Sequence, residues 1–393
     1  MLQCFGVSKQ KWLRTGIQHC SVIKLAYMKD FAIKLILFLL PFTIIPIINY
    51  TVDSYYVLGR SKQLAEIADT LLSGKNITGL VNFNDRYLQK QIIRKMKKIP
   101  DVIALGSSQT MELRTSYLGK PPGSFFNHSV AAGNLHDIIA ILGCYKKRGQ
   151  LPKQIIISVS VSSFIDKLWE VAAFGDRWQT LASEYYYLQT LIEKRGSFSF
   201  EFFLRAEAAI QEYKLLFSFN YALTNFKNIK FLLENDLLFR VAEEDSIDQK
   251  FFRSDGSYHR NLKYDDTETL KRTESYINDL KKTKDYEIIN KELFINLVDY
   301  LLSCGSQVIF FLPPYHPMFY KELLKNKTLG VYLEVEKLIM DIARSRHIPI
   351  CGSYDPSNLG LESKNFLDAT HARDFTLKNI FNDFTRLTSH TTP

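Results

Sequence analysis

The sequence predicts an α/β fold, in which a three-layer domain on a mostly parallel sheet follows one N-terminal transmembrane helix. Beyond Pro100, short and nearly continuous apolar runs alternate with amphipathic helices, a pattern typical of parallel strands covered on both faces. The segment Phe31–Tyr50 holds a single charge, Lys34. The 393 residues are 46% hydrophobic and 23% charged, which is ordinary for a globular protein with a sizeable core.

The net charge of +9 is unevenly spread along the chain. The first thirty residues hold five lysines and arginines against one aspartate, so they carry +4 and the other 363 residues carry +5. That dilute surplus, without a basic helix or an RNA-binding motif, argues against a nucleic-acid partner. The five cysteines lie far apart, so neither a disulfide framework nor a thiolate metal site is expected. No metal-binding or nucleotide-binding fingerprint is present, and no cofactor is predicted.

Residues Phe31–Tyr50 are about long enough to cross a hydrocarbon core of roughly 30 Å. A buried core helix is less favoured because no polar face repeats, and a cleaved signal peptide because no Ala-x-Ala site follows the long basic leader. We therefore expect an uncleaved, single-pass anchor in the inner or cytoplasmic membrane. Four basic residues lie in the twenty positions before the segment and two in the twenty after it. The positive-inside rule then predicts that residues 1–30 form a cytoplasmic basic tail and that the body lies outside the cytoplasm, in the periplasm or at the cell surface.

Residues 51–99 are expected to form a helical neck next to the membrane. Helical periodicity covers Ser61–Leu72 and Asp85–Lys98. The residues around Asn76–Gly79 between them predict a turn.

Residues 100–393 are expected to form the α/β domain. Strands are predicted at Asp101–Gly106, Lys153–Val161, Ser306–Pro314 and Ile348–Gly352, and helices at Asn134–Lys147, Lys291–Ser303 and Glu334–Arg346. The segment from about Phe164 to Lys282 interrupts this alternation. It is rich in aromatic residues and mostly helical in period, which predicts a helical insertion that caps the sheet; the simpler reading of most of the aromatics is the core of the insertion itself.

The stretch Asp101–Thr110 reads DVIALGSSQT, an apolar run that ends in Gly106, Ser107 and Ser108. Ligands bind at the carboxyl ends of the strands in an open parallel sheet, so both serines stand where chemistry is expected. Gly106 permits a sharp turn there. If Ser108 begins a helix, its backbone N–H lies at the positive end of the helix dipole and can stabilise an oxyanion. The alternative is that the serine only caps a helix.

A serine hydroxyl becomes a good nucleophile only when a correctly oriented base takes its proton. The stretch Asn365–Thr376, NFLDATHARDFT, offers Asp368 and His371 three residues apart, after the last predicted strand. We expect Asp368 to accept a hydrogen bond from Nδ1 of His371 while Nε2 faces Ser108. The alternative is that Asp368 caps the next helix and His371 lies on the surface. The predicted catalytic residues are therefore Ser108, Asp368 and His371.

Gly-x-Ser after the first strand, a Gly-Asn turn and a late Asp-x-x-His together resemble the SGNH (GDSL-type) hydrolases. The resemblance covers roughly Asp101–Ser163 and Gln307–Phe384. It implies a flavodoxin-like fold and acyl transfer through a serine ester. Behind one N-terminal anchor, the pattern is closest to the extracytoplasmic branch, which includes the D-alanyl-lipoteichoic acid biosynthesis protein D and proteins of exopolysaccharide O-acetylation.

The resemblance also assigns an oxyanion hole. Gly133 matches the second block, where a glycine N–H joins the N–H of the nucleophile, here Ser108. Two departures stand out, because Gly-Ser-Ser replaces the commoner Gly-Asp-Ser and SVSVSSF stands where the third block has Gly-x-Asn. The hydroxyl of Ser160, or else of Ser162, is expected to take the place of that Asn. Losing one such donor costs about 10² to 10³ in rate.

Other side chains are candidates for substrate binding. Asn134 is adjacent to Gly133, and Tyr315 and His316 follow a predicted strand in PPYHP, which reads equally well as a rigid turn. The stretch Arg253–Arg260, RSDGSYHR, could grip an anion, although Asp-Gly is first a turn signal.

The sequence thus predicts an extracytoplasmic serine esterase or O-acyltransferase acting on a cell-envelope polysaccharide or glycolipid. The alternative is a non-catalytic, anchored partner of an integral-membrane acyltransferase or polysaccharide machine. A third reading is a membrane-tethered structural protein on an inherited fold.

Overall fold

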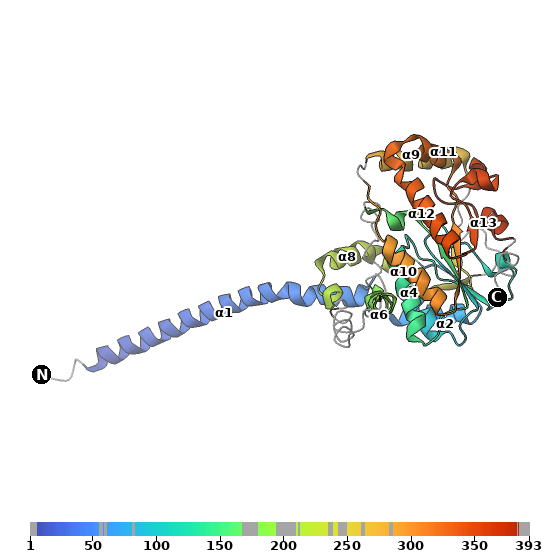
Figure 1. Cartoon of the computed structure of the whole chain (residues 1–393). Helices are drawn as coiled ribbons and strands as arrows, with labels where there is room; N and C mark the ends of the chain where they lie inside the picture. Colours follow the sequence, from blue (N-terminus) through green and yellow to red (C-terminus); the bar gives the residue numbers. More distant parts are fainter. Residues whose placement is uncertain are drawn as a thin grey trace.

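The computed structural model shows an α/β body from which one long helix projects (Figure 1). It describes residues 6–54, 58, 61–80, 83–166, 180–193, 210, 213–234, 239–242, 250–260, 264–282, 286–382 and 384. The parallel sheet of the body confirms the predicted α/β class, and the described residues include one long apolar helix near the N-terminus.

Five parallel strands form the main sheet, in the order β3-β2-β4-β8-β9. Their bounds are β2 (Val102–Leu105), β3 (Phe125–Asn127), β4 (Gln154–Ser158), β8 (Gln307–Leu312) and β9 (Ile350–Gly352). Numbered along the chain, the order is 2-1-3-4-5, that of flavodoxin-like doubly wound sheets. The connections reverse direction between β2 and β4, so the carboxyl ends of these strands form the switch point at which ligands bind in such sheets.

The two faces of the sheet support two cores, because successive side chains of a strand point to opposite sides. Ile103 and Leu105 face the larger core, which α4 (Leu135–Lys147), α10 (Lys291–Ser303) and α12 (Val331–Ser345) cover. Val102 and Ala104 face a smaller core, which includes Leu377 of α13 (Asp374–Ile380). The three predicted layers are therefore present. Strand β3 was not predicted, because three residues are too short to show a period.

A second, antiparallel sheet has the strand order β5-β1-β6-β7. It consists of β1 (Asn76–Thr78), β5 (Arg240–Ala242), β6 (Phe251–Phe252) and β7 (Tyr258–His259). The predicted turn at Asn76–Gly79 is therefore wrong, because the first three of these residues form the inner strand β1. Ile77 pairs with Val241 and Phe252, so the strand depends on partners that no local pattern reveals.

The predicted neck is part of the body. Helices α2 (Ser61–Leu72) and α3 (Asp85–Lys95) pack together, and Leu64 and Leu88 are both fully buried in the larger core. Helix α3 ends three residues earlier than predicted, where the chain runs on to Pro100 and β2. The described part of this region therefore packs on the domain and does not form a separate stalk.

The described parts of the insertion do not form one cap over the sheet. Helix α6 (Ala182–Ile192) packs along α4, and α8 (Phe219–Glu234) packs against α1. Helix α9 (Asp266–Lys282) contacts α11 (Pro317–Lys325), and β5 to β7 belong to the second sheet. The rest of the predicted insertion, including several of its aromatic residues, lies outside the described residues.

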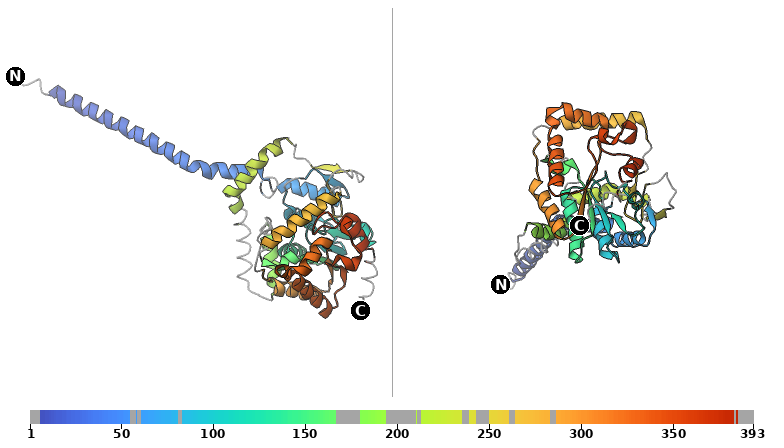
Figure 2. Two further views of the ribbon diagram at one scale, coloured as in Figure 1. Left: turned by 90° about the horizontal axis from the view of Figure 1, so that it is seen from above. Right: turned by 45° about the vertical axis from the view of Figure 1, so that its right-hand side comes forward.

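Helix α1 (Gly6–Val52) runs unbroken through Pro41 and Pro46. Its stretch Met28–Val52 is 25 residues long and apolar enough to cross a membrane, and it contains the segment predicted to do so. Figures 1 and 2 show this helix projecting away from the body, with only its C-terminal end in contact with other elements.

Candidate active site

The nucleophile candidate lies in a turn at the switch point. After β2 the chain turns at Gly106, and the N–H of Thr110 donates to the carbonyl oxygen of Ser107 (3.0 Å). A Cβ on Gly106 would approach the Cβ of Ser158, at the end of β4, to 2.5 Å, so this turn requires glycine. No helix begins at Ser108. The expectation that a helix dipole acts on its N–H is therefore wrong.

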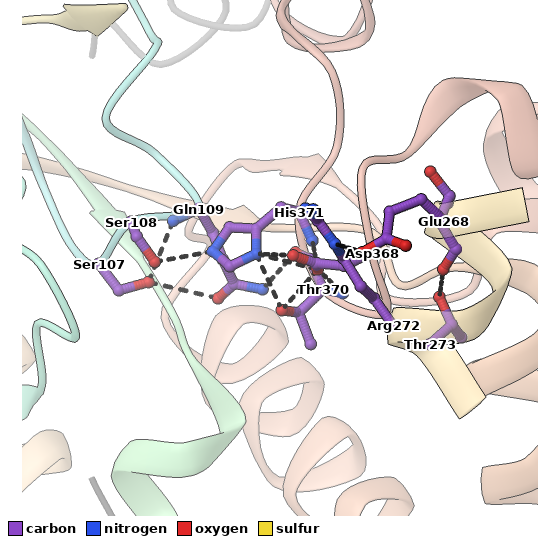
Figure 3. A network of polar contacts seen from close by, with 10 residues as sticks. Ser107, Ser108, Gln109, Glu268, Arg272, Thr273, Asp368, Thr370 and His371 are labelled. Carbon is purple, nitrogen blue, oxygen red and sulfur yellow. Dashed lines mark hydrogen bonds and ion pairs between the residues drawn. The ribbon is translucent and has the colours of Figure 1, made fainter. Parts of the chain in front are cut away.

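Ser108, His371 and Asp368 form a continuous hydrogen-bonded row, with His371 in the middle (Figure 3). Ser108 Oγ lies 2.8 Å from Nε2 of His371, and Nδ1 of His371 lies 2.8 Å from Oδ2 of Asp368. The residues come from two segments 263 positions apart in the chain. The hydrogen bonds expected from the sequence are thus all present.

A tight reversal of the chain brings Asp368 and His371 together. Phe366 and Ala372 form an antiparallel bridge, and the N–H of Leu367 donates to the carbonyl oxygen of His371 (2.8 Å). The enclosed residues must therefore turn back over a few positions, which places the two side chains on the same side. This turn realises the i, i+3 pairing expected from the sequence.

Asp368 is held as a carboxylate. Burial alone would raise its pKa, but hydrogen bonds from His371 and from the N–H groups of Thr370 and His371 hold the pKa of Asp368 well below its usual range. An ionised Asp368 can only accept, so it fixes the proton of neutral His371 on Nδ1. Nε2 is then free to accept the hydroxyl proton of Ser108. The side chains of His371 and Asp368 are 23% and 28% exposed, so a substrate can reach them.

Gln109, which the sequence analysis overlooked, connects the two halves of the site. Its Nε2 donates to the carbonyl oxygen of Thr370 at 2.9 Å, between the nucleophile turn and the histidine loop. Its position next to Ser108 was the only available signal. Glu112 is also buried near this site, and its Oε1 accepts from the N–H of the half-buried Arg260 (3.3 Å). Burial raises the pKa of Glu112, and the charge of Arg260 opposes that rise.

Gly133 lies against the nucleophile turn, as the oxyanion-hole prediction requires. A Cβ on Gly133 would approach the carbonyl oxygen of Gly106 to 2.3 Å, so only glycine allows this contact. The N–H of Gly133, however, donates to the carbonyl oxygen of Val130 (3.0 Å) and would have to be shared with a substrate. The N–H of Ser108 has no hydrogen-bond acceptor within the part of the chain that the structure describes. It is the more available of the two donors.

The serines after β4 do not form an obvious replacement for the missing asparagine. The hydroxyls of Ser160 and Ser162 lie 2.7 Å apart and bond to each other. The hydroxyl of Ser158 is buried beside Gly106, and it makes no hydrogen bond to a described residue. The third-block role expected of Ser160 stays a prediction.

Three predicted binding residues have structural roles instead. Asn134 caps α4, where its Oδ1 accepts from the N–H of Asp137 (3.0 Å). Tyr315 is 4% exposed and stacks on Tyr354 within the core. His316 is 1% exposed, and its Nε2 lies 2.9 Å from the hydroxyl of Ser363. The prediction that Tyr315 and His316 line the site is wrong, because Tyr315 packs among aromatic rings and both ring nitrogens of His316 are bonded, one to Ser363 and one to the N–H of Met318.

In RSDGSYHR the turn reading is correct. The N–H of Gly256 donates to the carbonyl oxygen of Arg253 (2.9 Å), which closes the hairpin between β6 and β7. Asp255 accepts from the N–H and the hydroxyl of Thr115, both at 2.8 Å. The hairpin is thereby fixed to the segment that follows the nucleophile turn.

A buried ionic cluster holds the turn that contains Gly133. Arg86 of α3 is fully buried and makes two hydrogen bonds to the carboxylate of Asp137, at 2.9 and 2.8 Å. It also donates to Asp85 (2.9 Å) and to the carbonyl oxygen of Ala131 (2.7 Å). The second oxygen of Asp85 accepts from the N–H of Ala131 (2.7 Å). Both the N–H and the carbonyl oxygen of Ala131, in the turn before α4, are therefore bonded to side chains of α3.

We expect Arg86→Met to lower the free energy of unfolding by about 3–5 kcal/mol, because Asp137 and Asp85 would be left buried without their counter-charge. Urea denaturation of the full-length protein in detergent measures the change. The matched variant Arg344→Met removes an arginine that is 77% exposed and pairs with Asp341, so about 0–1 kcal/mol is expected there. A loss for Arg86→Met no larger than that of Arg344→Met would contradict the role given to the cluster.

In comparisons with known proteins, no family model and no curated sequence matches this chain. Among the described residues, no group of three or more His, Cys, Asp or Glu side chains is arranged to hold a metal ion.

Proposed function

We propose that this protein is a membrane-anchored, extracytoplasmic serine esterase or O-acyltransferase. The observation that carries the proposal is the row Ser108–His371–Asp368, in which each side chain bonds to the next at 2.8 Å. A serine, a histidine and a half-buried carboxylate in this order activate a hydroxyl for attack on an acyl carbon. The row also stands at the switch point of the sheet, where doubly wound domains bind their ligands.

In the first half-reaction Ser108 Oγ attacks the carbonyl carbon of an ester as Nε2 of His371 takes the hydroxyl proton. Asp368 keeps the imidazole in place and stabilises the imidazolium that forms. The negative oxygen of the tetrahedral intermediate is met by the N–H of Ser108, with the N–H of Gly133 as the second donor. When the bond to the leaving alcohol breaks, Nε2 returns its proton to that alcohol and an acyl-serine remains.

In the second half-reaction a hydroxyl group attacks the acyl-serine. His371 takes the proton of that hydroxyl, the ester bond to Ser108 breaks, and the proton passes to Ser108 Oγ. Water as the attacking group gives hydrolysis, and a sugar hydroxyl gives acyl transfer. The same residues therefore serve both reactions.

The SGNH resemblance supports this assignment, because the chain order Ser, Asp, His and the strand order 2-1-3-4-5 both fit it. The apolar stretch Met28–Val52 and the basic residues before it support an anchor with the body outside the cytoplasm. A body tethered there would meet the polysaccharides and glycolipids of the cell envelope. We infer that these are its acyl donors or acceptors.

A second candidate function is a non-catalytic partner of an integral-membrane acyltransferase or polysaccharide machine. Two observations favour it, since Ser160 and Ser162 bond to each other and the N–H of Gly133 is engaged with Val130. An oxyanion hole with one fully available donor would be weak. A deletion strain in which Ser108→Ala restores full envelope acylation would establish this alternative.

A fluorophosphonate probe tests the enzymatic proposal directly. Serine attack on phosphorus expels fluoride and leaves a stable adduct, so we expect one labelled peptide, the one that contains Ser108. Labelling of the detergent-purified full-length chain is followed by mass spectrometry. Ser108→Ala should abolish the adduct, and His371→Gln should slow its formation strongly because the base is lost. A folded protein that stays unlabelled, or that reacts equally well without His371, would count against the proposal.

A further inference from the structure

Exposed apolar side chains gather in one short part of the body. Outside α1, twelve large hydrophobic side chains are exposed among the described residues, and half of them lie between positions 210 and 226. These six are Ile210, Tyr213, Phe217, Phe219, Leu223 and Phe226, with exposed fractions between 44% and 67%. Soluble surfaces rarely leave so many large apolar groups together, and such a patch marks a contact with a membrane or with another protein.

Helix α8 has two distinct faces. Phe219, Leu223 and Phe226 stand at positions i, i+4 and i+7, so they share one outer face, and all three are exposed. Tyr221 and Asn225 lie on the other side, which is buried against the end of α1. The inner side of α8 is thus covered by α1. The outer, apolar face has no cover in the part of the chain that the structure describes.

The inner side of this region is bonded to the C-terminal end of α1. Asn49 is fully buried, and its Nδ2 donates to the carbonyl oxygens of Leu216 (2.8 Å) and Ser218 (2.9 Å). Its Oδ1 accepts from Nδ2 of Asn225 of α8 (3.0 Å). The hydroxyl of Tyr221, also in α8, donates to buried Asp53 (2.7 Å). These polar bonds hold α8 at a fixed height on the anchor helix.

That height coincides with the outer edge of the apolar stretch. A rise of about 1.5 Å per residue makes 20 residues span the roughly 30 Å of a hydrocarbon core. Counted from Phe31, just after the charged pair Lys29 and Asp30, the core ends near Tyr50, one residue after Asn49. Figures 1 and 2 show α8 lying across this end of α1. The outer face of α8 therefore lies at the level where acyl chains meet headgroups.

We propose that α8 is an interfacial membrane helix, whose outer face (Phe219, Leu223 and Phe226) inserts into the lipid layer beside α1. The proposal rests on α1 crossing the membrane, as part of the proposed function. The bilayer is the partner that covers this face, because α8 is hydrogen-bonded to the end of the helix that spans the membrane. Exposed Lys214 and Lys227 flank it and would reach anionic headgroups. Contact of α8 with the lipid, in addition to the spanning helix α1, fixes the orientation of the body relative to the membrane. With α1 alone, the body could rotate and tilt about the end of that helix.

Spin labels on the full-length chain in lipid vesicles test the proposal. Phe219→Cys, Leu223→Cys and Phe226→Cys are each labelled with a nitroxide in a protein whose Cys4, Cys20 and Cys304 are replaced by serine. Collisions with oxygen, which concentrates in lipid, are compared with collisions with a water-soluble nickel chelate. We expect all three α8 positions to favour oxygen over nickel severalfold more than Leu324→Cys, a 62% exposed position on α11.

Leu37→Cys, 61% exposed in the middle of the apolar stretch of α1, reports whether the anchor itself lies in lipid. If position 37 favours oxygen while the α8 positions behave like position 324, α8 faces water and the interfacial helix is refuted, although the anchor stands. If position 37 also favours nickel, the anchor fails and the proposal fails with it. Labels on α8 that are shielded from both reagents would assign the face to a second protein chain, which also overturns it.

Discussion

Replacing Ser108 with alanine should lower the turnover of an activated acetyl ester by about 10⁴-fold or more. The variant has no hydroxyl within reach of Nε2 of His371, which lies 2.8 Å from Ser108 Oγ in the wild type. No acyl-serine can then form, and only binding and oxyanion stabilisation of a direct attack by water would remain. The values of kcat and KM for the full-length protein in detergent measure the effect, and the loss should fall on kcat.

Ser107→Ala is the matched control, because it removes a neighbouring hydroxyl from the same turn. Ser107 is 6% exposed. Its Oγ lies 3.4 Å from Oε1 of Gln109, a distance too long for a strong hydrogen bond. We expect its kcat to stay within a few-fold of the wild type. Equal losses in the two variants would point to damage to the turn, and an active Ser108→Ala protein would exclude the acyl-serine route.

The central sheet and the row of three side chains were accessible to sequence reasoning because their signals are local. Buried parallel strands read as apolar runs, and β2, β4, β8 and β9 were found that way. The carboxyl ends of such strands meet at one edge, so Ser108 and the Asp368–His371 pair could be brought together without knowing the structure. The i, i+3 spacing allows Asp368 and His371 to meet but does not require it. In the structure the chain reversal between Phe366 and Ala372 brings the two side chains together.

The second sheet and the supporting ionic cluster could not be predicted, because they depend on long-range pairing. Ile77 pairs with Val241 across 164 positions, and Arg86 reaches Asp137 across 51. A three-residue strand has no period, and a charged residue on an amphipathic helix normally indicates a solvated face. Arg86 is instead completely buried, since Asp137 and Asp85 take up its charge. Long-range packing also explains why the predicted neck is part of the body, because its helices and β1 contact segments that lie far away in the sequence.

The proposed oxyanion hole lacks a third donor both in the sequence and in the structure. SVSVSSF lacks the expected asparagine, and in the structure Ser160 and Ser162 satisfy each other. In the proposed mechanism the N–H of Ser108 therefore contributes more of the stabilisation of the oxyanion than it would beside two further donors. In the proposed mechanism the orientation of His371 is decisive as well, because Nε2 must accept the proton of Ser108.

Asp368→Asn should therefore lower kcat by about 10⁴-fold while leaving the loop folded. The carbonyl oxygen of the amide can still accept from the N–H groups of Thr370 and His371, which donate to Oδ1 of Asp368 in the wild type at 2.9 and 3.0 Å. Its NH₂ group would then face Nδ1 of His371 and favour the tautomer protonated on Nε2. That tautomer cannot take the proton of Ser108. Steady-state kinetics and the rate of fluorophosphonate labelling should fall together, with the thermal unfolding temperature nearly unchanged.

Asp374→Asn separates orientation of the histidine from a general loss of negative charge near the site. Asp374 lies three residues beyond His371 and pairs with Arg114 at 3.1 Å, without a bond to the imidazole. The identical substitution there should change kcat only a few-fold. If instead Asp368→Asn keeps kcat within tenfold of the wild type while Ser108→Ala is inactive, His371 is oriented without its carboxylate, and the mechanism reduces to a serine–histidine pair. The 2.8 Å contact between Nδ1 and Oδ2 would then stabilise the loop and not the transition state.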